Sequence, residues 1–161
     1  MRLSFGAALL AFSPAVLGWR LTMYSQKDCN DYDGDFSYYV LKGTGKMTYC
    51  VGLGAEAWEI PEGVTCGYYT QNGAVGPEDC NGQMKEALSF KVGRGTAQFW
   101  DEFDTDDWQR IDVRCSGGFG GFPRAGNGGS DFRASTECRN TYYHNDGDKI
   151  ELTAKGFMAW D

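Results

Sequence analysis

Two dense clusters of acidic side chains have the composition of a cation site or an acid/base site. The first is DCNDYDGD, residues 28–35. An EF-hand loop needs oxygen ligands at positions 1, 3 and 5, glycine at 6 and glutamate at 12. With Gly34 at position 6, Cys29 and Val40 occupy positions 1 and 12, so we predict an Asx-rich turn instead. The remaining metal hypothesis is a weak, irregular calcium site of four carboxylates: Asp28, Asp31, Asp33 and Asp35.

The second acidic cluster, WDEFDTDDW at residues 100–108, places five carboxylates between two tryptophans. Carboxylates held close together raise one another's pKa, which suits the acid/base pair of a glycoside hydrolase. Such a pair needs a separation of about 5–10 Å across a cleft, which sequence spacing does not establish. We predict a solvated loop between two strands. The alternative is a small hydrolase that uses Asp104 or Asp107 with Glu102.

Other catalytic chemistry has less support. The chain has a single histidine, His144, so a zinc ligand set is not available, and a Ser/His/Asp triad would have to use this residue. A G-x-S-x-G motif is absent. We therefore predict no catalytic residues and no cofactor.

Residues 1–18 have the pattern of an export signal. Arg2 precedes an apolar run from Leu3 to Phe12, and small residues follow. Cleavage after Gly18 is favoured, with cleavage after Ala15 as the alternative. The apolar run is shorter than the ~20 residues that span a bilayer. The expected product is an extracellular protein without membrane insertion, with a single secreted β domain over residues 19–161.

The cysteines support an oxidising destination. All six follow the predicted signal, and an even set allows three disulfides in 15 connectivities. They are Cys29, Cys50, Cys66, Cys80, Cys115 and Cys138. We predict Cys115 with Cys138 as the best single pairing, and Cys29–Cys80 and Cys50–Cys66 would complete the set.

Most of the remaining segments are short, alternate in polarity and are rich in aromatic or β-branched residues, as half-buried strands are. In WRLTMYS, Trp19, Leu21 and Met23 share one face. Residues 43–45 and 145–147 are expected to form hairpin turns, and residues 148–160 a last strand with a bulge at Gly156. The predicted fold is all-β: a single-domain antiparallel β-sandwich or closed barrel of about seven to nine strands.

Recognition is expected from loops and outward-facing aromatic rings. Neighbours on a strand face opposite sides, so pairs such as Tyr38-Tyr39 and Tyr68-Tyr69 place one ring outward, for protein contact, sugar stacking or cross-strand packing. Residues 116–131 form a glycine-rich loop. Candidate binding residues in this loop and beside the acidic cluster are Trp100, Trp108, Phe119, Phe122 and Arg124.

The net charge restricts the partners. At pH 7 it is −7, which repels a phosphate backbone and an anionic membrane, and no run of lysine or arginine offsets it. We therefore do not expect nucleic acid to be a partner.

Several stretches in order resemble small secreted cysteine-rich proteins of ascomycete fungi, which are commonly described as candidate effectors or elicitors. These stretches are WRLTMYS before Cys29, YYVLKGTG before Cys50 and GVTCGYYTQ before Cys80. The resemblance covers about residues 1–115 and supplies no catalytic residues. It implies a non-enzymatic binding protein that acts on a host protein or a cell-wall glycan. The alternative from the residues is a carbohydrate-active protein, either a lectin-like module or the hydrolase described above.

Overall fold

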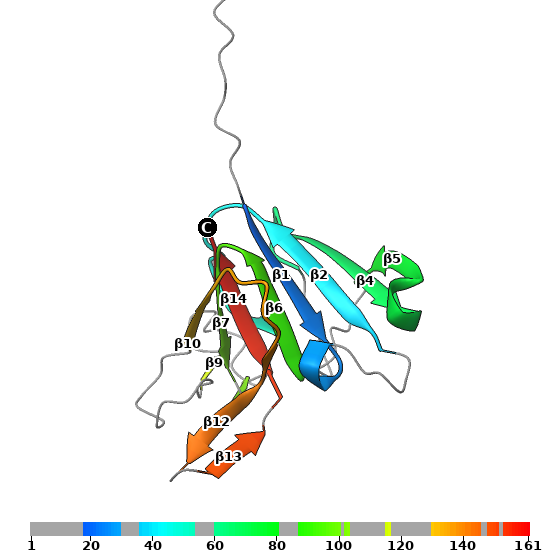
Figure 1. Ribbon diagram of the computed structural model, residues 1–161. Helices are drawn as coiled ribbons and strands as arrows, with labels where there is room; N and C mark the ends of the chain where they lie inside the picture. The colour runs from blue at the N-terminus through cyan, green and yellow to red at the C-terminus, as the bar shows by residue number, and fades with distance from the viewer. Residues whose placement is uncertain are drawn as a thin grey trace, which may run out of the picture.

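The computed structural model describes residues 18–29, 36–53, 60–80, 87–100, 102–103, 115–116, 130–145, 148–151 and 153–161. Their regular structure is β-strand, together with two 3-10 turns, η1 (Lys27–Cys29) and η2 (Gln71–Gly73). The described strands form two larger antiparallel sheets and two short two-stranded ribbons (Figure 1). No helix in these parts of the chain has the length and apolar character needed to cross a membrane.

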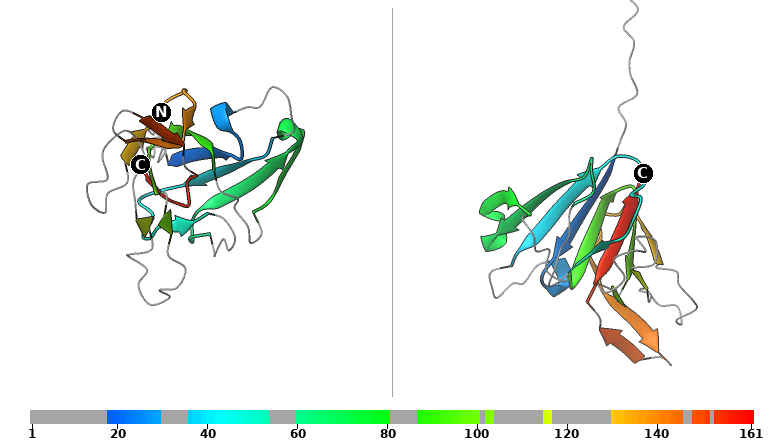
Figure 2. Two further views of the ribbon diagram at one scale, coloured as in Figure 1. Left: turned by 90° about the horizontal axis from the view of Figure 1, so that it is seen from below. Right: turned by 180° about the vertical axis from the view of Figure 1, so that it is seen from behind.

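The two larger sheets form separate layers (Figure 2). The six-stranded sheet has, in spatial order, β11 (Arg139–Asn140), β6 (Ser89–Arg94), β1 (Trp19–Tyr24), β2 (Tyr38–Gly43), β4 (Thr65–Thr70) and β5 (Val75–Asp79). The four-stranded sheet has β10 (Ser130–Arg133), β7 (Thr96–Trp100), β14 (Gly156–Trp160) and β3 (Val51–Gly52). The ribbons are β12 (Tyr142–Asn145) with β13 (Asp148–Glu151), and β8 (Glu102–Phe103) with β9 (Cys115–Ser116).

This arrangement confirms the predicted all-β fold as a sandwich, and the described strands do not close into a barrel. They number fourteen, more than the seven to nine expected, in part because four of them are only two residues long. Such short strands carry too few residues for alternation to reveal them in a sequence.

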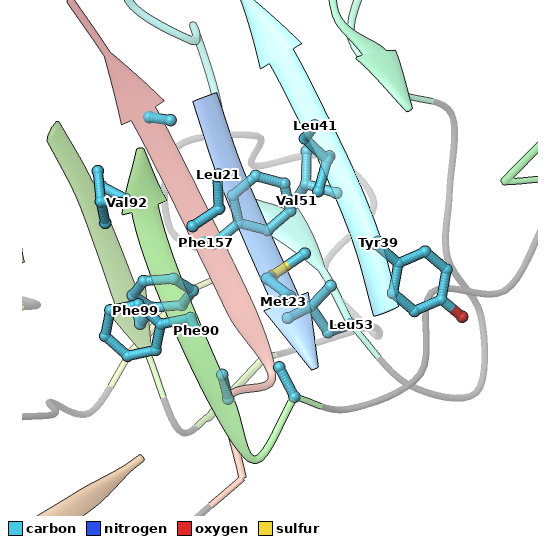
Figure 3. Packing of buried hydrophobic residues seen from close by; sticks show 14 of the residues in the cluster. Leu21, Met23, Tyr39, Leu41, Val51, Leu53, Phe90, Val92, Phe99 and Phe157 are labelled. Carbon is cyan, nitrogen blue, oxygen red and sulfur yellow. The ribbon is translucent and has the colours of Figure 1, made fainter. Parts of the chain in front are cut away.

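The core lies between the two sheets and is set by alternation along the central strand β1 (Figure 3). Trp19, Leu21 and Met23 are each at most 2% exposed, as the sequence predicted, while the residues between them are not buried. From the second sheet, Phe99 packs against Phe90 of β6 with ring centroids 4.1 Å apart. Burial of each large apolar side chain contributes about 1.5–3 kcal/mol to folding.

Gly95 alone connects β6 in one sheet to β7 in the other. Its φ is 73°, in the left-handed region that favours glycine. A Cβ at this position would lie 2.6 Å from the Cβ of Trp19, which real side chains do not tolerate. The sheet corner therefore depends on glycine for both conformation and space.

The predicted hairpin at residues 43–45 is wrong. β2 pairs with β1 and β4, whereas β3 pairs with β14 of the other sheet. The chain after β2 instead runs beside β14, where the Met47 amide donates to the Ala159 carbonyl at 3.0 Å and the Leu53 amide to the Lys155 carbonyl at 2.7 Å. Gly45 has a φ of 71° and so supports a turn, but the turn leads from one sheet to the other.

The C-terminal segment also differs from its prediction as one bulged strand. β13 pairs with β12 in register Asn145↔Asp148, which confirms the hairpin expected at residues 145–147, and this ribbon projects beyond the two sheets (Figure 1). Ala154 is fully buried and forms a bridge to Ala87 before β14 begins at Gly156. The chain thus changes partners between the two halves of the expected strand.

The predicted disulfide connectivity is wrong, because Cys138 pairs with Cys29 and not with Cys115. Two features of β6 explain the pairing. The Cys29 amide in η1 donates to Ser89 Oγ at 2.9 Å, and β11, which directly follows Cys138, pairs with β6 through Asn140↔Ser89. Both cysteines therefore reach the same end of β6 although 109 positions separate them in the sequence.

The second described bridge joins Cys66 to Cys80 and replaces the expected Cys29–Cys80 and Cys50–Cys66 pairs. β4 and β5 are neighbours with Gly67 opposite Asp79, which brings the adjoining cysteines together. Every residue of β5 is exposed, so this bridge holds an edge strand that has no buried side chain of its own. Cys50 is also disulfide-bonded, and the side chain of Cys115 lies outside the described residues.

We expect Gly95→Ala to destabilise the fold more than Gly45→Ala does. Both glycines have positive φ, so alanine at either position costs about 1–2 kcal/mol. Only at Gly95 does the new methyl group also meet the core, since nothing lies within 4 Å of a Cβ at Gly45. Urea unfolding of the two variants measures the difference, and equal losses would contradict the proposed crowding at the sheet corner.

Peptide mapping without reduction should recover Cys29 linked to Cys138 and Cys66 linked to Cys80. Replacing Cys29 and Cys138 together by serine should lower the free energy of unfolding by about 4–5 kcal/mol, and the Cys66/Cys80 double variant by about 3 kcal/mol, because the larger loop loses more chain entropy on closure. A peptide in which Cys115 is linked to Cys138 would refute this connectivity.

Candidate functional site

The outer face of the six-stranded sheet carries three rows of side chains. Because alternate residues of β1 face the core, Arg20, Thr22 and Tyr24 lie on the opposite face. Residues directly paired in antiparallel strands share a face, so the strand register extends each of these residues into a row across the sheet. In Figure 1 the strands that carry the rows, β6, β1, β2 and β4, lie side by side.

The first row is aromatic. Tyr24 pairs with Tyr38 of β2, and Tyr38 pairs with Tyr69 of β4. The rings of Tyr38 and Tyr69 stack with centroids 4.8 Å apart, and Tyr24 lies 5.5 Å from Tyr38 at a tilt. Phe36 adds a fourth ring 5.9 Å from Tyr38. We call these four residues the aromatic cluster. The sequence left outward-facing rings and cross-strand aromatic pairs as alternatives, and in this cluster both occur together.

The other two rows are basic. Arg20 pairs with Arg94 of β6 on one side and with Lys42 of β2 on the other. The second basic row lies between the row of Arg20 and the aromatic row, and in it Thr22 pairs with Lys91 of β6. Arg20, Lys42 and Arg94 are exposed and Lys91 is half-buried. Neighbouring strands are about 4.8 Å apart, so three of these cations occupy adjacent positions on three consecutive strands.

These two rows form the floor of an open groove with a volume of about 1000 Å³. We call it the basic groove. Its lining includes the four cations, the hydroxyls of Thr22, Thr44, Thr65, Ser135 and Thr136, and the ring of Tyr24 at one end. Gly63 and Gly93 add backbone without side chains, which helps to keep the groove open.

Among the residues that the structure describes, the charge in the basic groove has no opposite charge beside it. The described residues that line the groove include no aspartate and no glutamate. Within the described parts of the chain, no carboxylate lies within 4.0 Å of the charged groups of these four side chains. Like charges at directly opposed positions destabilise a sheet, so the free protein carries a repulsion that a bound anion would relieve.

Tyr24 connects the basic groove to the aromatic cluster. The Lys91 ammonium lies over its ring, 5.8 Å from the centroid, which is a cation–π contact. Burial raises the pKa of the Tyr24 phenol, the nearby Tyr38 raises it further, and Arg20 opposes the shift. The phenol therefore stays neutral and keeps its hydroxyl proton as a hydrogen-bond donor at any ordinary pH.

The structure places Trp100 in the interior and not on the surface as expected. It is 6% exposed at the end of β7, where it pairs with Gly156 of β14. The other residues expected to bind a partner, Trp108, Phe119, Phe122 and Arg124, lie outside the described residues, so their roles remain predictions. The same holds for Asp104, Asp107 and the side chain of Glu102 in the hydrolase alternative.

Of the four carboxylates in the calcium hypothesis, only Asp28 is described. Its backbone amide donates to Asn140 Oδ1 at 2.7 Å, and Asn140 Nδ2 donates to its carboxylate at 2.6 Å. Asp28 thus ties η1 to β11 beside the Cys29–Cys138 bridge. Asp31, Asp33 and Asp35 lie outside the described residues, and the described ones contain no group of three or more residues arranged to hold a metal ion.

Sequence reasoning missed the basic groove because its cations lie far apart in the sequence and never form a run. The available signal was alternation, since Arg20 and Lys91 are each the polar residue between two apolar ones. Alternation favours the solvent face for such residues, but only the order β6-β1-β2 brings Arg20 and Lys91 together.

Comparison with known proteins identifies one family. Residues 19–117 match the family model described as "Secreted LysM effector LysM14, C-terminal domain". The match covers more than half of the chain and includes β1, β2 and β6, which carry the four cations of the groove. No curated protein and no solved structure matches the chain.

The family match agrees with the resemblance seen in the sequence and confirms a secreted fungal effector type, with an extracellular location. The description assigns no ligand to the matched domain. On this match, the chain belongs to the family of the C-terminal domain of the secreted LysM effector LysM14.

Proposed function

We propose that this protein is a non-enzymatic effector that binds a glycan chain of a cell wall or host surface in the basic groove. The observation that carries the proposal is the groove itself, in which an aromatic ring, several hydroxyls and four cations converge on one open face. Aromatic rings pack against the apolar faces of sugars, and hydroxyls and cations hydrogen-bond to the oxygens at their edges. These are the chemical groups that a carbohydrate ligand requires.

The shape of the groove supports a polymer over a small molecule. It is open and crosses several strands, with residues of β6, β1 and β2 along its floor and Thr65 of β4 beyond them. Small-molecule sites bury most of their ligand in a concave pocket. An open groove on a rigid sheet instead lets a chain enter and leave at its ends. A sheet also holds the contact residues in place, so little side-chain freedom is lost on binding.

The chemistry of the groove supports binding over catalysis. Glycoside hydrolysis uses two carboxyl groups that flank the scissile bond, and the described lining offers none. It also contains no histidine or cysteine that could act as a base or nucleophile. Membership of a secreted effector family is consistent with action by binding.

Tyr24→Ala should weaken retention on an immobilised polysaccharide by about threefold to tenfold, the worth of one aromatic packing contact. The probes are chitin, cellulose, xylan and polygalacturonate, with the amount of bound protein measured by pull-down. Tyr24→Phe keeps the ring and should retain most of the binding. Soluble reducing sugar should not increase during incubation with any of the polymers.

Tyr69→Ala is the matched control. Tyr69 belongs to the aromatic cluster but does not line the groove, so its loss should lower the unfolding temperature without weakening retention. If Tyr24→Ala and Tyr69→Ala weaken retention equally, the ring of Tyr24 supports the sheet and not the ligand. If all four polymers fail to retain the unaltered protein, the proposed function is wrong.

A further inference from the structure

The sign of the charge in the basic groove is opposite to that of the whole protein. The chain has a net charge of −7, with 22 acidic and 15 basic residues. Four of these basic residues nevertheless line one groove in which none of the described lining residues is acidic. On an ordinary solvated surface, cations and carboxylates lie near one another, because opposite charges attract. The segregation points to a ligand that is negatively charged.

The spacing of the cations indicates how that charge is distributed. Arg94, Arg20 and Lys42 occupy directly paired positions on β6, β1 and β2, next to a register shift between Arg20 and Leu21, so each strand contributes one cationic residue and the strand backbones are about 4.8 Å apart. This step is close to the length of one sugar unit in an extended polysaccharide. A chain that crosses the strands and carries one carboxylate on each sugar would therefore meet one cation per unit.

We propose that the ligand is an acidic polysaccharide built from uronic acid units, bound across β6, β1 and β2. This inference rests on the proposed function and adds the chemical class of its ligand. The planar guanidinium groups of Arg20 and Arg94 can each donate two hydrogen bonds to a carboxylate, and the ammonium groups of Lys42 and Lys91 add point charges. The sugar ring beside Lys91 packs on Tyr24, which lies at the same end of the groove.

The same features argue against other polyanions. Duplex nucleic acid carries two phosphate strands, so part of its charge would lie outside a groove that holds one chain and would be repelled by the acidic remainder of this protein. Single-stranded nucleic acid also needs free aromatic faces for its bases, whereas the rings of Tyr38 and Tyr69 are stacked on each other. An anionic membrane is repelled for the same reason of net charge.

The test compares two polymers that share one backbone: polygalacturonate and its fully methyl-esterified form, whose carboxylates are neutral. The unaltered protein should bind polygalacturonate at least tenfold more tightly than the ester, and added NaCl should weaken binding to polygalacturonate only. Lys42→Gln and Arg20→Gln should each weaken binding to polygalacturonate by about fivefold, the upper range for one exposed charge pair, and leave binding to the ester unchanged.

Lys155→Gln and Arg133→Gln are matched controls that remove the same charges from exposed positions outside the groove. They should bind polygalacturonate like the unaltered protein, which separates the groove from net charge. Equal binding to both polymers would overturn the inference but leave glycan binding intact. Equal losses in the groove variants and the controls would also overturn it. Binding to single-stranded DNA or phosphatidylserine vesicles, with no binding to any polysaccharide, would overturn the proposed function as well.

Discussion

The two-residue period of β1 is the constraint on which the rest of the structure depends. This strand is central in the six-stranded sheet, with β2 on one side and β6 on the other. Burying one set of its side chains fixes the core, and the same alternation commits the other set to the outer face. A register slip of one residue would exchange the two sets, so the stability of the core also determines where the groove residues stand.

The disulfides restrain the two edges of the six-stranded sheet, which the core does not hold in place. One bridge holds η1 and the segment before β11 against the end of β6, where buried Ser89 also accepts a hydrogen bond from the Cys29 amide. The other closes the exposed edge formed by β4 and β5. Together they restrain both flanks of a sheet whose middle strands carry the candidate site. This rigidity preorganises the cations, so binding needs little rearrangement.

Local pattern predicted what local interactions determine. Alternation identified β1 and the faces of its side chains, and turn residues identified the β12–β13 hairpin, because each of these signals lies within a few neighbouring positions. Strand partners could not be predicted in this way. The segments before and after Gly43 look like a hairpin, but residues 46–53 gain more by covering the core beside β14. The prediction of the cysteine pairing was wrong for the same reason, since the two cysteines that bond meet at β6 although they are far apart in the sequence.

In the candidate site, too, local pattern predicted some features, and others depended on contacts between distant parts of the chain. Trp100 stands next to a run of carboxylates and was expected at the surface, yet its strand continues into the core with both Phe99 and Trp100 buried. The cations of the groove gave no signal as a group, because charge clustering across a sheet depends on strand order and not on spacing in the chain. The polarity of a single residue therefore predicted which face of the sheet its side chain lies on. Which side chains come together in a site depended on the order of the strands in the sheet.

The pairing of β7 with the C-terminal strand β14 has a consequence for how the chain matures. Phe99 and Phe157 lie opposite each other in adjacent strands, and both are fully buried. A growing polypeptide cannot close this interior until residues 156–160 have been synthesised, so the apolar face of the first strands stays exposed until then. Such non-local closure is slow and exposes the waiting chain to aggregation. Chaperones and oxidoreductases that act after synthesis are therefore expected to decide how much of this protein reaches its native form.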